Sequence, residues 1–231
     1  MKDYQKKFIE FALENNVLCF GDFTLKSGRK SPYFFNAGLF HSSKALSLIG
    51  EFYAHTIKEN FTEEFDVLFG PAYKGISLAT VAASRLYDLY NVNVNVSFNR
   101  KEVKDHGEKK LLIGSELKNK KVLIVDDVIT AGITIYETLD LIKANGGTCV
   151  GIVILLDRME KNVDDKLSAI ESLRREHNLK VVSIINIEIL LEYLETHRDS
   201  FADHLTSIKK YLQTFGNVST SSRVDGCTVS H

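Results

Sequence analysis

Cysteine is scarce in this 231-residue chain, and its placement excludes several classes of protein. The three cysteines, Cys19, Cys149 and Cys227, are odd in number and include no C-x-x-C pair. They argue against a disulfide framework or a zinc site and are typical of a reducing compartment. The opening MKDYQKKF lacks an apolar signal core, and no apolar run approaches the length of a membrane span. We therefore expect a cytoplasmic protein that does not contact membranes.

An excess of charge of either sign is also missing. The formal net charge is -1, so the chain as a whole does not attract nucleic acid. Hydrophobic residues at 44% and charged residues at 26% are typical of a soluble globular enzyme, and the length allows one domain with a full core. We assign residues 1–215 to that domain and expect the Ser/Thr-rich residues 216–231 to form a disordered tail.

Strand-like apolar runs alternate with helical patterns along most of the chain. Strands are expected at 66–70, 92–98, 122–125, 148–156 and 181–187, and helices at 4–15, 42–60, 75–90 (nearly all apolar and buried), 134–145, 164–177, 188–196 and 201–215. The pattern predicts an α/β fold with an open, mainly parallel sheet flanked by helices. Residues 17–40, rich in Gly, Ser and aromatics, predict a small N-terminal β hood. Ligands of such sheets bind at the carboxyl ends of the strands.

Residues 121–134, KVLIVDDVITAGIT, join a buried strand to a helix through a small-residue turn. Thr134 and Glu137 have the spacing of a capping box, which predicts the helix start. A Gly-containing turn and a helix amino terminus together favour a phosphate, whereas Asp126 and Asp127 suit ribose hydroxyls or magnesium. The stretch is neither a Walker A loop nor a GxGxxG motif. The alternative is an ordinary βα unit whose acids happen to lie at a strand end.

The sequence VLIVDDVITAGIT resembles the phosphoribosyl-pyrophosphate motif of the type I phosphoribosyltransferases. The resemblance implies that the acids hold the ribose hydroxyls and that the turn holds the 5-phosphate. The residues to which it gives this role are Asp126, Asp127, Val128, Ile129, Thr130, Ala131, Gly132, Ile133 and Thr134. Ile133 departs from the small polar residue of many members and would offer only its backbone N–H.

Residues 70–75, GPAYKG, form a second strand–turn–helix junction. From the residues alone it is either a phosphate cradle or a tight turn with a solvated lysine. In the family that it resembles, this is the pyrophosphate loop, so Tyr73 and Lys74 would touch the phosphates. Because strain gathers at ligand clamps, we predict a cis peptide bond between Ala72 and Tyr73.

The polar segment 99–112 includes RKEVKDHG and is expected to be a mobile lid. Its composition alone also fits a solvated charged loop. RKxxKxH resembles the catalytic loop of orotate-using members of the family, which implies that Arg100, Lys101, Lys104 and His106 bind the leaving pyrophosphate. The same resemblance implies a homodimer in which the lid reaches the neighbouring subunit.

Two further stretches concern the binding of the substrate base. The hood sequence FTLKSGRKSPYFFNAG resembles that of the orotate enzymes, which implies that Lys26 reaches the phosphoribosyl substrate and that Phe34 and Phe35 border orotate. On their own, two adjacent phenylalanines in such a hood are more often explained by hydrophobic packing than by binding of a base. Arg158 follows the strand 148–156, and the family position gives it, with Thr130, an orotate contact. The alternative is that Arg158 pairs with Asp157 or Glu160.

The resemblance as a whole implies transfer of a phosphoribosyl group to orotate, giving orotidine 5-monophosphate and pyrophosphate in UMP biosynthesis. The implied catalytic residues are Lys104, Arg100, Asp126 and Asp127. Magnesium is expected as cofactor, held mainly by substrate and water rather than by a protein cage. A purine phosphoribosyltransferase and a non-catalytic nucleotide sensor remain as alternatives, which the hood and the cationic lid respectively argue against.

Overall fold

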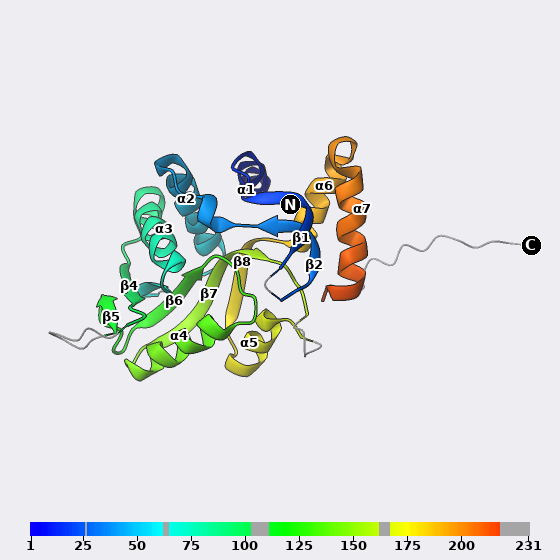
Figure 1. Cartoon of the computed structure of the whole chain (residues 1–231). Helices are drawn as coiled ribbons and strands as arrows, with labels where there is room; N and C mark the ends of the chain where they lie inside the picture. The colour runs from blue at the N-terminus through cyan, green and yellow to red at the C-terminus, as the bar shows by residue number, and fades with distance from the viewer. Residues whose placement is uncertain (26, 62–64, 103–110, 162–166, 218–231) are drawn as a thin grey trace, which may run out of the picture.

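A six-stranded sheet forms the centre of the protein, with helices on both faces (Figure 1). The computed structural model describes the chain except residues 26, 62–64, 103–110, 162–166 and 218–231. All neighbouring strands are parallel except the first pair, so the predicted α/β fold is confirmed. The strand order is β5 (Leu112–Gly114), β4 (Asn95–Asn99), β3 (Val67–Gly70), β6 (Lys121–Asp126), β7 (Thr148–Asp157) and β8 (Lys180–Asn186).

The sheet separates two hydrophobic clusters, one on each of its faces, and helices cover both clusters. The larger cluster includes side chains from α1 (Asp3–Glu14), α2 (Ser43–Asn60), α3 (Lys74–Tyr90), α6 (Ile187–Thr196) and α7 (Arg198–Phe215). The smaller cluster includes those of α4 (Ile133–Ala144) and α5 (Ala169–His177). Because both faces are covered, the central strand β6 is an unbroken apolar run whose residues 122–125 are fully buried.

The predicted hood is a separate antiparallel hairpin of β1 (Leu18–Thr24) and β2 (Lys30–Phe35), followed by the short helix η1 (Ala37–Leu39). It lies against α7, where the ring of Phe20 stacks on His204 with 5.0 Å between centroids. Phe20 also meets Phe201 edge to face at 5.6 Å, beside the point where non-helical backbone angles interrupt α7. The hood therefore packs on the last helix as well as on the core.

Several predicted boundaries need correction. Helix α4 begins at Ile133 with Gly132 as its N-cap, so the predicted capping box of Thr134 and Glu137 is wrong. The positive φ of Gly132, 80°, turns the chain into the helix before Thr134 is reached. Helix α5 begins at Ala169, where Ser168 and Glu171 form a true capping box, and the predicted start at 164 lies outside the described residues.

Two other expectations were too broad. Helix α3 is not buried all round, because Tyr87 is 57% exposed and Leu89 is 44% exposed. Strand β4 begins only at Asn95, since the residues from 92 to 94 lead out of a left-handed turn at Asn91. The edge strand β5 begins at Leu112, the last residue of the segment expected to be lid, and was not predicted.

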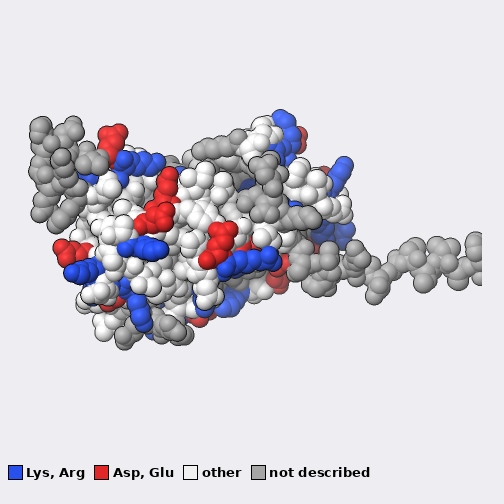
Figure 2. All heavy atoms as spheres, turned by 90° about the horizontal axis from the view of Figure 1, so that it is seen from below, with Lys and Arg blue, Asp and Glu red and all other residues white. Residues whose placement is uncertain are grey.

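The end of the described chain is tied to the body of the protein. Gly216 pairs with Glu160 in an isolated antiparallel bridge, and the Asn217 N–H donates to the Met159 carbonyl over 2.7 Å. Both residues belong to the segment expected to be tail, whose remaining part lies outside the described residues. In the described ranges no helix has the combination of length and apolarity that crossing a bilayer requires. Figure 2 shows positive and negative side chains interspersed on the face that carries α4 and α5.

Candidate active site

The acidic pair expected to bind ribose lies at the carboxyl end of the central strand. Asp126 and Asp127 are only 9% and 7% exposed. The Tyr53 hydroxyl, fully buried on α2, donates to the Asp126 carbonyl over 2.7 Å. The Asp127 carbonyl accepts the Leu155 N–H over 2.9 Å, which ties the pair to β7. Contacts from both sides thus fix the backbone of the two acids.

Burying two adjacent carboxylates costs electrostatic free energy, and two features of the site reduce this cost. The Asp127 carboxylate accepts a hydrogen bond from the Lys74 ammonium group. Burial and the charge of Asp127 raise the pKa of Asp126 to about 7, although the Asp127 N–H and Lys74 act against the rise. Near neutral pH the pair therefore carries less than two full negative charges.

The predicted phosphate cradle at residues 70–75 lies directly beside the acidic pair. Its Ala72–Tyr73 peptide bond is cis, as predicted. A Cβ on Gly70 would overlap the Gly75 carbonyl, and one on Gly75 would lie 2.7 Å from the Pro71 ring, so both glycines are required by close backbone packing. The Lys74 side chain reaches across to Asp127, which joins the cradle to the acidic pair.

Asn99 holds this cradle in place, and the sequence analysis did not single it out. Its side-chain oxygen accepts the Ala72 N–H over 2.8 Å from the end of the neighbouring strand β4. The signal available in the sequence was a polar residue at the carboxyl end of the strand next to the predicted phosphate cradle. Tyr53, within the predicted helix 42–60, was likewise not singled out as a site residue.

The turn expected to hold the 5-phosphate opens to solvent. Thr130, Ala131, Ile133 and Thr134 are exposed, whereas Val128 and Ile129 are half-buried and pack on the two core clusters. The Ile135 and Tyr136 N–H groups both donate to the Gly132 carbonyl, over 2.9 and 3.0 Å. The N–H groups that precede them in the helix have no acceptor within the helix, which is the arrangement that an anion site needs.

The described part of the lid brings cations to the same edge of the sheet. Lys101 Nζ lies 5.2 Å from the centroid of the Tyr73 ring, which is 69% exposed. The Arg100 N–H donates to the Leu111 carbonyl over 2.7 Å, and its Nε is buried without an acceptor in the described ranges. Lys104 and His106 lie outside the described residues, so their predicted roles remain predictions.

The hood places its two phenylalanines differently. Phe34 is 38% exposed and stacks on Phe23 at 5.5 Å between centroids, while Phe35 packs towards the core with its centroid 6.4 Å from that of Phe8. Successive strand residues point to opposite faces, so the two rings do not form one platform. Phe34 alone presents its ring openly, and Lys26 lies outside the described residues.

Arg158 is buried, with a side chain 12% exposed, and it forms the pairing that was weighed as the alternative. Its Nε donates to Glu160 Oε1 over 2.8 Å and its Nη2 donates to the Ser31 hydroxyl over 3.0 Å. The guanidinium lies 4.0 Å above the Tyr33 ring centroid. The carboxyl end of β7 and the hood therefore meet at this arginine.

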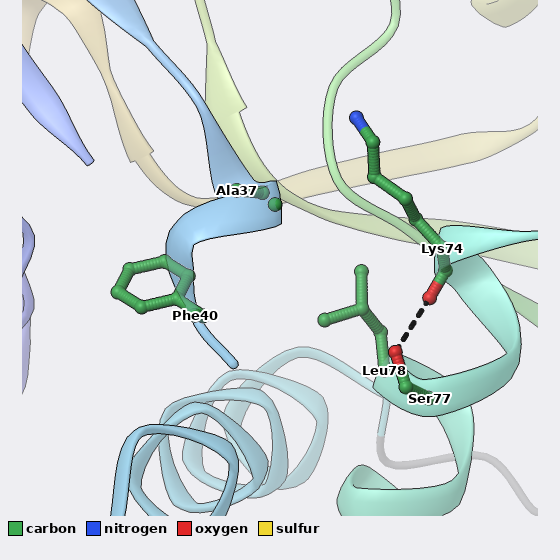
Figure 3. A pocket seen from close by; sticks show the side chains of 6 residues that line it. Ala37, Phe40, Lys74, Ser77 and Leu78 are labelled. Atoms are coloured by element: carbon green, nitrogen blue, oxygen red, sulfur yellow. Dashed lines mark hydrogen bonds between the residues drawn. The ribbon is translucent and has the colours of Figure 1, made fainter. Parts of the chain in front are cut away.

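A small hollow of about 210 Å³ lies between η1 and the start of α3 (Figure 3). Phe40 and Leu78 lie on its two sides, and Lys74 extends its ammonium group away from Leu78. The lining residues are Ala37, Gly38, Phe40, Lys74, Ser77 and Leu78. The lining thus combines the apolar side chains of Phe40 and Leu78 with the polar side chains of Lys74 and Ser77.

The acidic pair fits a magnesium ion only as a partial ligand set. Across the described ranges, no cluster of three or more His, Cys, Asp or Glu side chains is placed to hold a metal. Two carboxylates can supply a minority of the oxygen ligands that magnesium takes, with the rest from water and substrate phosphates.

Comparison with known proteins decides the family. The model of the phosphoribosyl transferase domain matches residues 38–186. The orotate phosphoribosyltransferase of Shigella flexneri is 51% identical over 94% of this chain and 100% of its own length. The chain belongs to the orotate phosphoribosyltransferase family.

Solved structures of this family agree with the fold. The orotate phosphoribosyltransferase of Francisella tularensis is 40% identical with a TM-score of 0.83, covering 91% of this chain and 100% of that chain. That of Mycobacterium tuberculosis, in complex with 5-phospho-α-D-ribosyl 1-diphosphate, is similar in fold at 21% identity and a TM-score of 0.61, covering 81% of this chain and 98% of that chain. The sheet and the N-terminal hairpin are thus a type I phosphoribosyltransferase fold.

The buried Tyr53 hydroxyl yields a direct test of how the acidic strand end is held. Tyr53→Phe should lower the free energy of unfolding by about 1–2 kcal/mol, because it removes a donor from the buried Asp126 carbonyl. Urea denaturation followed by circular dichroism measures the change. Tyr87→Phe, on an exposed ring, is the control. Equal stability of the two variants would show that the Tyr53 bond does not support the site.

Proposed function

We propose that the chain catalyses transfer of the phosphoribosyl group from 5-phosphoribosyl 1-pyrophosphate to orotate, forming orotidine 5-monophosphate and pyrophosphate. The step belongs to pyrimidine (UMP) biosynthesis, and the enzyme is a glycosyltransferase. The observation that carries the proposal is the buried acidic pair of β6 between two phosphate-type turns, in a chain that has the hood and the family's sequence. This arrangement suits a sugar with a phosphate on either side.

The reaction asks the protein mainly to position two substrates and to stabilise charge. A ring nitrogen of orotate attacks the anomeric carbon as pyrophosphate leaves, so no covalent bond to the protein is needed. Asp126 and Asp127 accept the ribose hydroxyls, and the turn 128–134 donates backbone N–H groups to the 5-phosphate. Tyr73 and Lys74 contact the pyrophosphate, for which Lys74 leaves its present pairing with Asp127.

The lid supplies the cations for the leaving group. Arg100 and Lys101, with Lys104, would neutralise charge that grows on pyrophosphate, and His106 would donate to it. Closure would also exclude water that hydrolyses the sugar. The buried Arg100 Nε, which has no acceptor among the described residues, supports a role for this side chain in binding an anion.

We place the bound orotate between the hood and the sheet. Phe34 offers its ring, Phe35 only its backbone, and Arg158 and Thr130 contact polar atoms of the base. The pairing of Arg158 with Glu160 leaves Nη1 for this contact. Lys26 would reach the phosphoribosyl substrate from the same hairpin.

We also propose magnesium as cofactor and a homodimer as the working form. Asp126 and Asp127 would at most supplement the substrate and water ligands that mainly hold the ion, and the ion would supply positive charge against the phosphates. In the dimer the lid of one subunit would reach the site of its partner. The free Cys19 and Cys149 fit the cytoplasm as location.

The base specificity can be tested directly. The purified protein is mixed with 5-phosphoribosyl 1-pyrophosphate and magnesium and offered orotate, adenine, hypoxanthine or uracil, and ultraviolet absorbance follows loss of the base. Turnover with orotate alone supports the proposal. Turnover with a purine would keep the sugar site and reject the assignment of the hood, and binding without turnover would indicate a sensor.

Lys104→Ala should reduce turnover by about a hundredfold, on the order of 3 kcal/mol of transition-state stabilisation, with little change in orotate binding. The reason is that its charge is needed only as pyrophosphate departs. Steady-state kinetics measures the loss, and Lys118→Ala, on the exposed amino side of β6, is the control. Unchanged turnover under conditions where chemistry limits the rate would remove Lys104 from the mechanism.

The raised pKa of Asp126 predicts how substrate affinity depends on pH. Below pH 7 the carboxyl is mostly protonated, and above pH 7 it is a charged acceptor for ribose hydroxyls. Affinity for 5-phosphoribosyl 1-pyrophosphate should therefore rise as pH increases from 6 to 8. Calorimetric titration of wild type and Asp126→Asn separates this step from ionisation of the ligand. A profile identical in both proteins would contradict the assignment.

A further inference from the structure

A second buried polar cluster lies where the hood meets the carboxyl end of β7. It contains Arg158, Glu160 and Arg29, whose side chains are only 12%, 12% and 14% exposed. Ser31 and Tyr33 of strand β2 complete it, and both are buried. Among the described residues, Glu160 is the carboxylate that contacts both arginines, so it determines how the cluster is arranged.

Glu160 and Ser31 contact one edge of the Arg158 guanidinium, and the ring of Tyr33 contacts its face. Glu160 Oε1 accepts from Nε over 2.8 Å and lies 2.6 Å from Nη2, which in turn donates to Ser31. The Tyr33 ring lies against the face of the group at 4.0 Å. Nη1 takes no part in these contacts with Glu160 and Ser31. Nε and Nη2 of Arg158 are therefore already paired within the protein, and Nη1 is left to contact a ligand.

Glu160 is itself held firmly. The Tyr33 hydroxyl donates to Oε1 over 3.3 Å, and Arg29 Nη1 lies 3.7 Å from Oε2. Its backbone is bridged to Gly216, and the N–H of the next residue, Lys161, donates to the Phe215 carbonyl over 2.9 Å. The hood thus holds the carboxylate, while Phe215 of α7 and Gly216 hold the backbone that carries it, which leaves Glu160 little freedom to move.

We propose that Glu160 is a positioning residue for orotate, acting through Arg158. The inference rests on the proposed function, in which Arg158 contacts the base. A long arginine side chain loses rotamer freedom when it binds, and a guanidinium that is already fixed loses less of it on contact with the ligand. A negative carboxylate would repel the orotate anion at close range. Glu160 therefore favours orotate binding by orienting Arg158 and not by touching the ligand.

The test compares Glu160→Ala, Glu160→Gln and Glu160→Asp in steady-state kinetics. Alanine removes the partner of Nε and should raise the KM for orotate about tenfold or more, while the KM for 5-phosphoribosyl 1-pyrophosphate stays within about twofold. Glutamine keeps an oxygen at the same reach and should stay within about threefold of wild type. Aspartate keeps the charge but withdraws the oxygen, so it should raise the orotate KM more than glutamine does.

Two further variants separate positioning from general stability. Asp66→Ala removes a carboxylate that pairs with Lys120 at the amino end of β3, away from the site, and should leave the orotate KM unchanged. In the Arg158→Ala background, Glu160→Ala should add no further rise, because its effect passes through Arg158. Thermal melting of every variant confirms that it is folded.

The outcomes are distinct. An orotate KM unchanged in Glu160→Ala, or a glutamine variant worse than the aspartate variant, would overturn the inference, because charge or mere packing would then explain Glu160. A further rise in the double variant would overturn it as well. If the alanine variant does not fold, the comparison of glutamine with aspartate still decides. Failure of the wild-type protein to use orotate would instead reject the proposed function.

Discussion

Two buried carboxylates at the end of a parallel strand are the constraint on which this site depends. Asp126 and Asp127 follow an apolar strand that is covered on both faces, so they leave water at an electrostatic cost. The Lys74 ammonium group pairs with Asp127, and the raised pKa of Asp126 reduces the remaining charge. In the function that we propose, ribose hydroxyls take the place of these partners and donate hydrogen bonds to the two acids.

The neighbouring loops are positioned by that strand end. The cradle at 70–75 depends on close backbone contact at its glycines and on Asn99 from β4, and the turn after Asp127 uses Gly132 to begin α4. All of these segments follow the carboxyl ends of adjacent parallel strands, where ligands of open α/β sheets bind. The hood closes the remaining side through Arg158, which is shared between β7 and β2.

Sequence patterns predicted the parts of the molecule that depend on local chemistry. The alternation of apolar runs predicted the sheet, and the Gly-, Ser- and aromatic-rich residues 17–40 predicted the hairpin. The residues at strand ends predicted the acidic pair and the cis bond at Ala72–Tyr73. The capping box at Thr134 failed because a glycine with positive φ begins the helix earlier, which spacing alone does not reveal. Tyr53 and Asn99 were missed as site residues because their roles depend on partners 73 and 27 positions away that only the folded chain brings into contact.

The central claim is that the acidic pair binds the sugar of 5-phosphoribosyl 1-pyrophosphate. Calorimetric titration with this ligand and magnesium, in the absence of any base, tests it most directly in wild type and in the Asp126→Asn, Asp127→Asn double variant. The account predicts binding in wild type and an affinity at least about tenfold weaker in the double variant, with an unchanged circular dichroism spectrum. Equal affinities in the two folded proteins would contradict it and would place the sugar elsewhere.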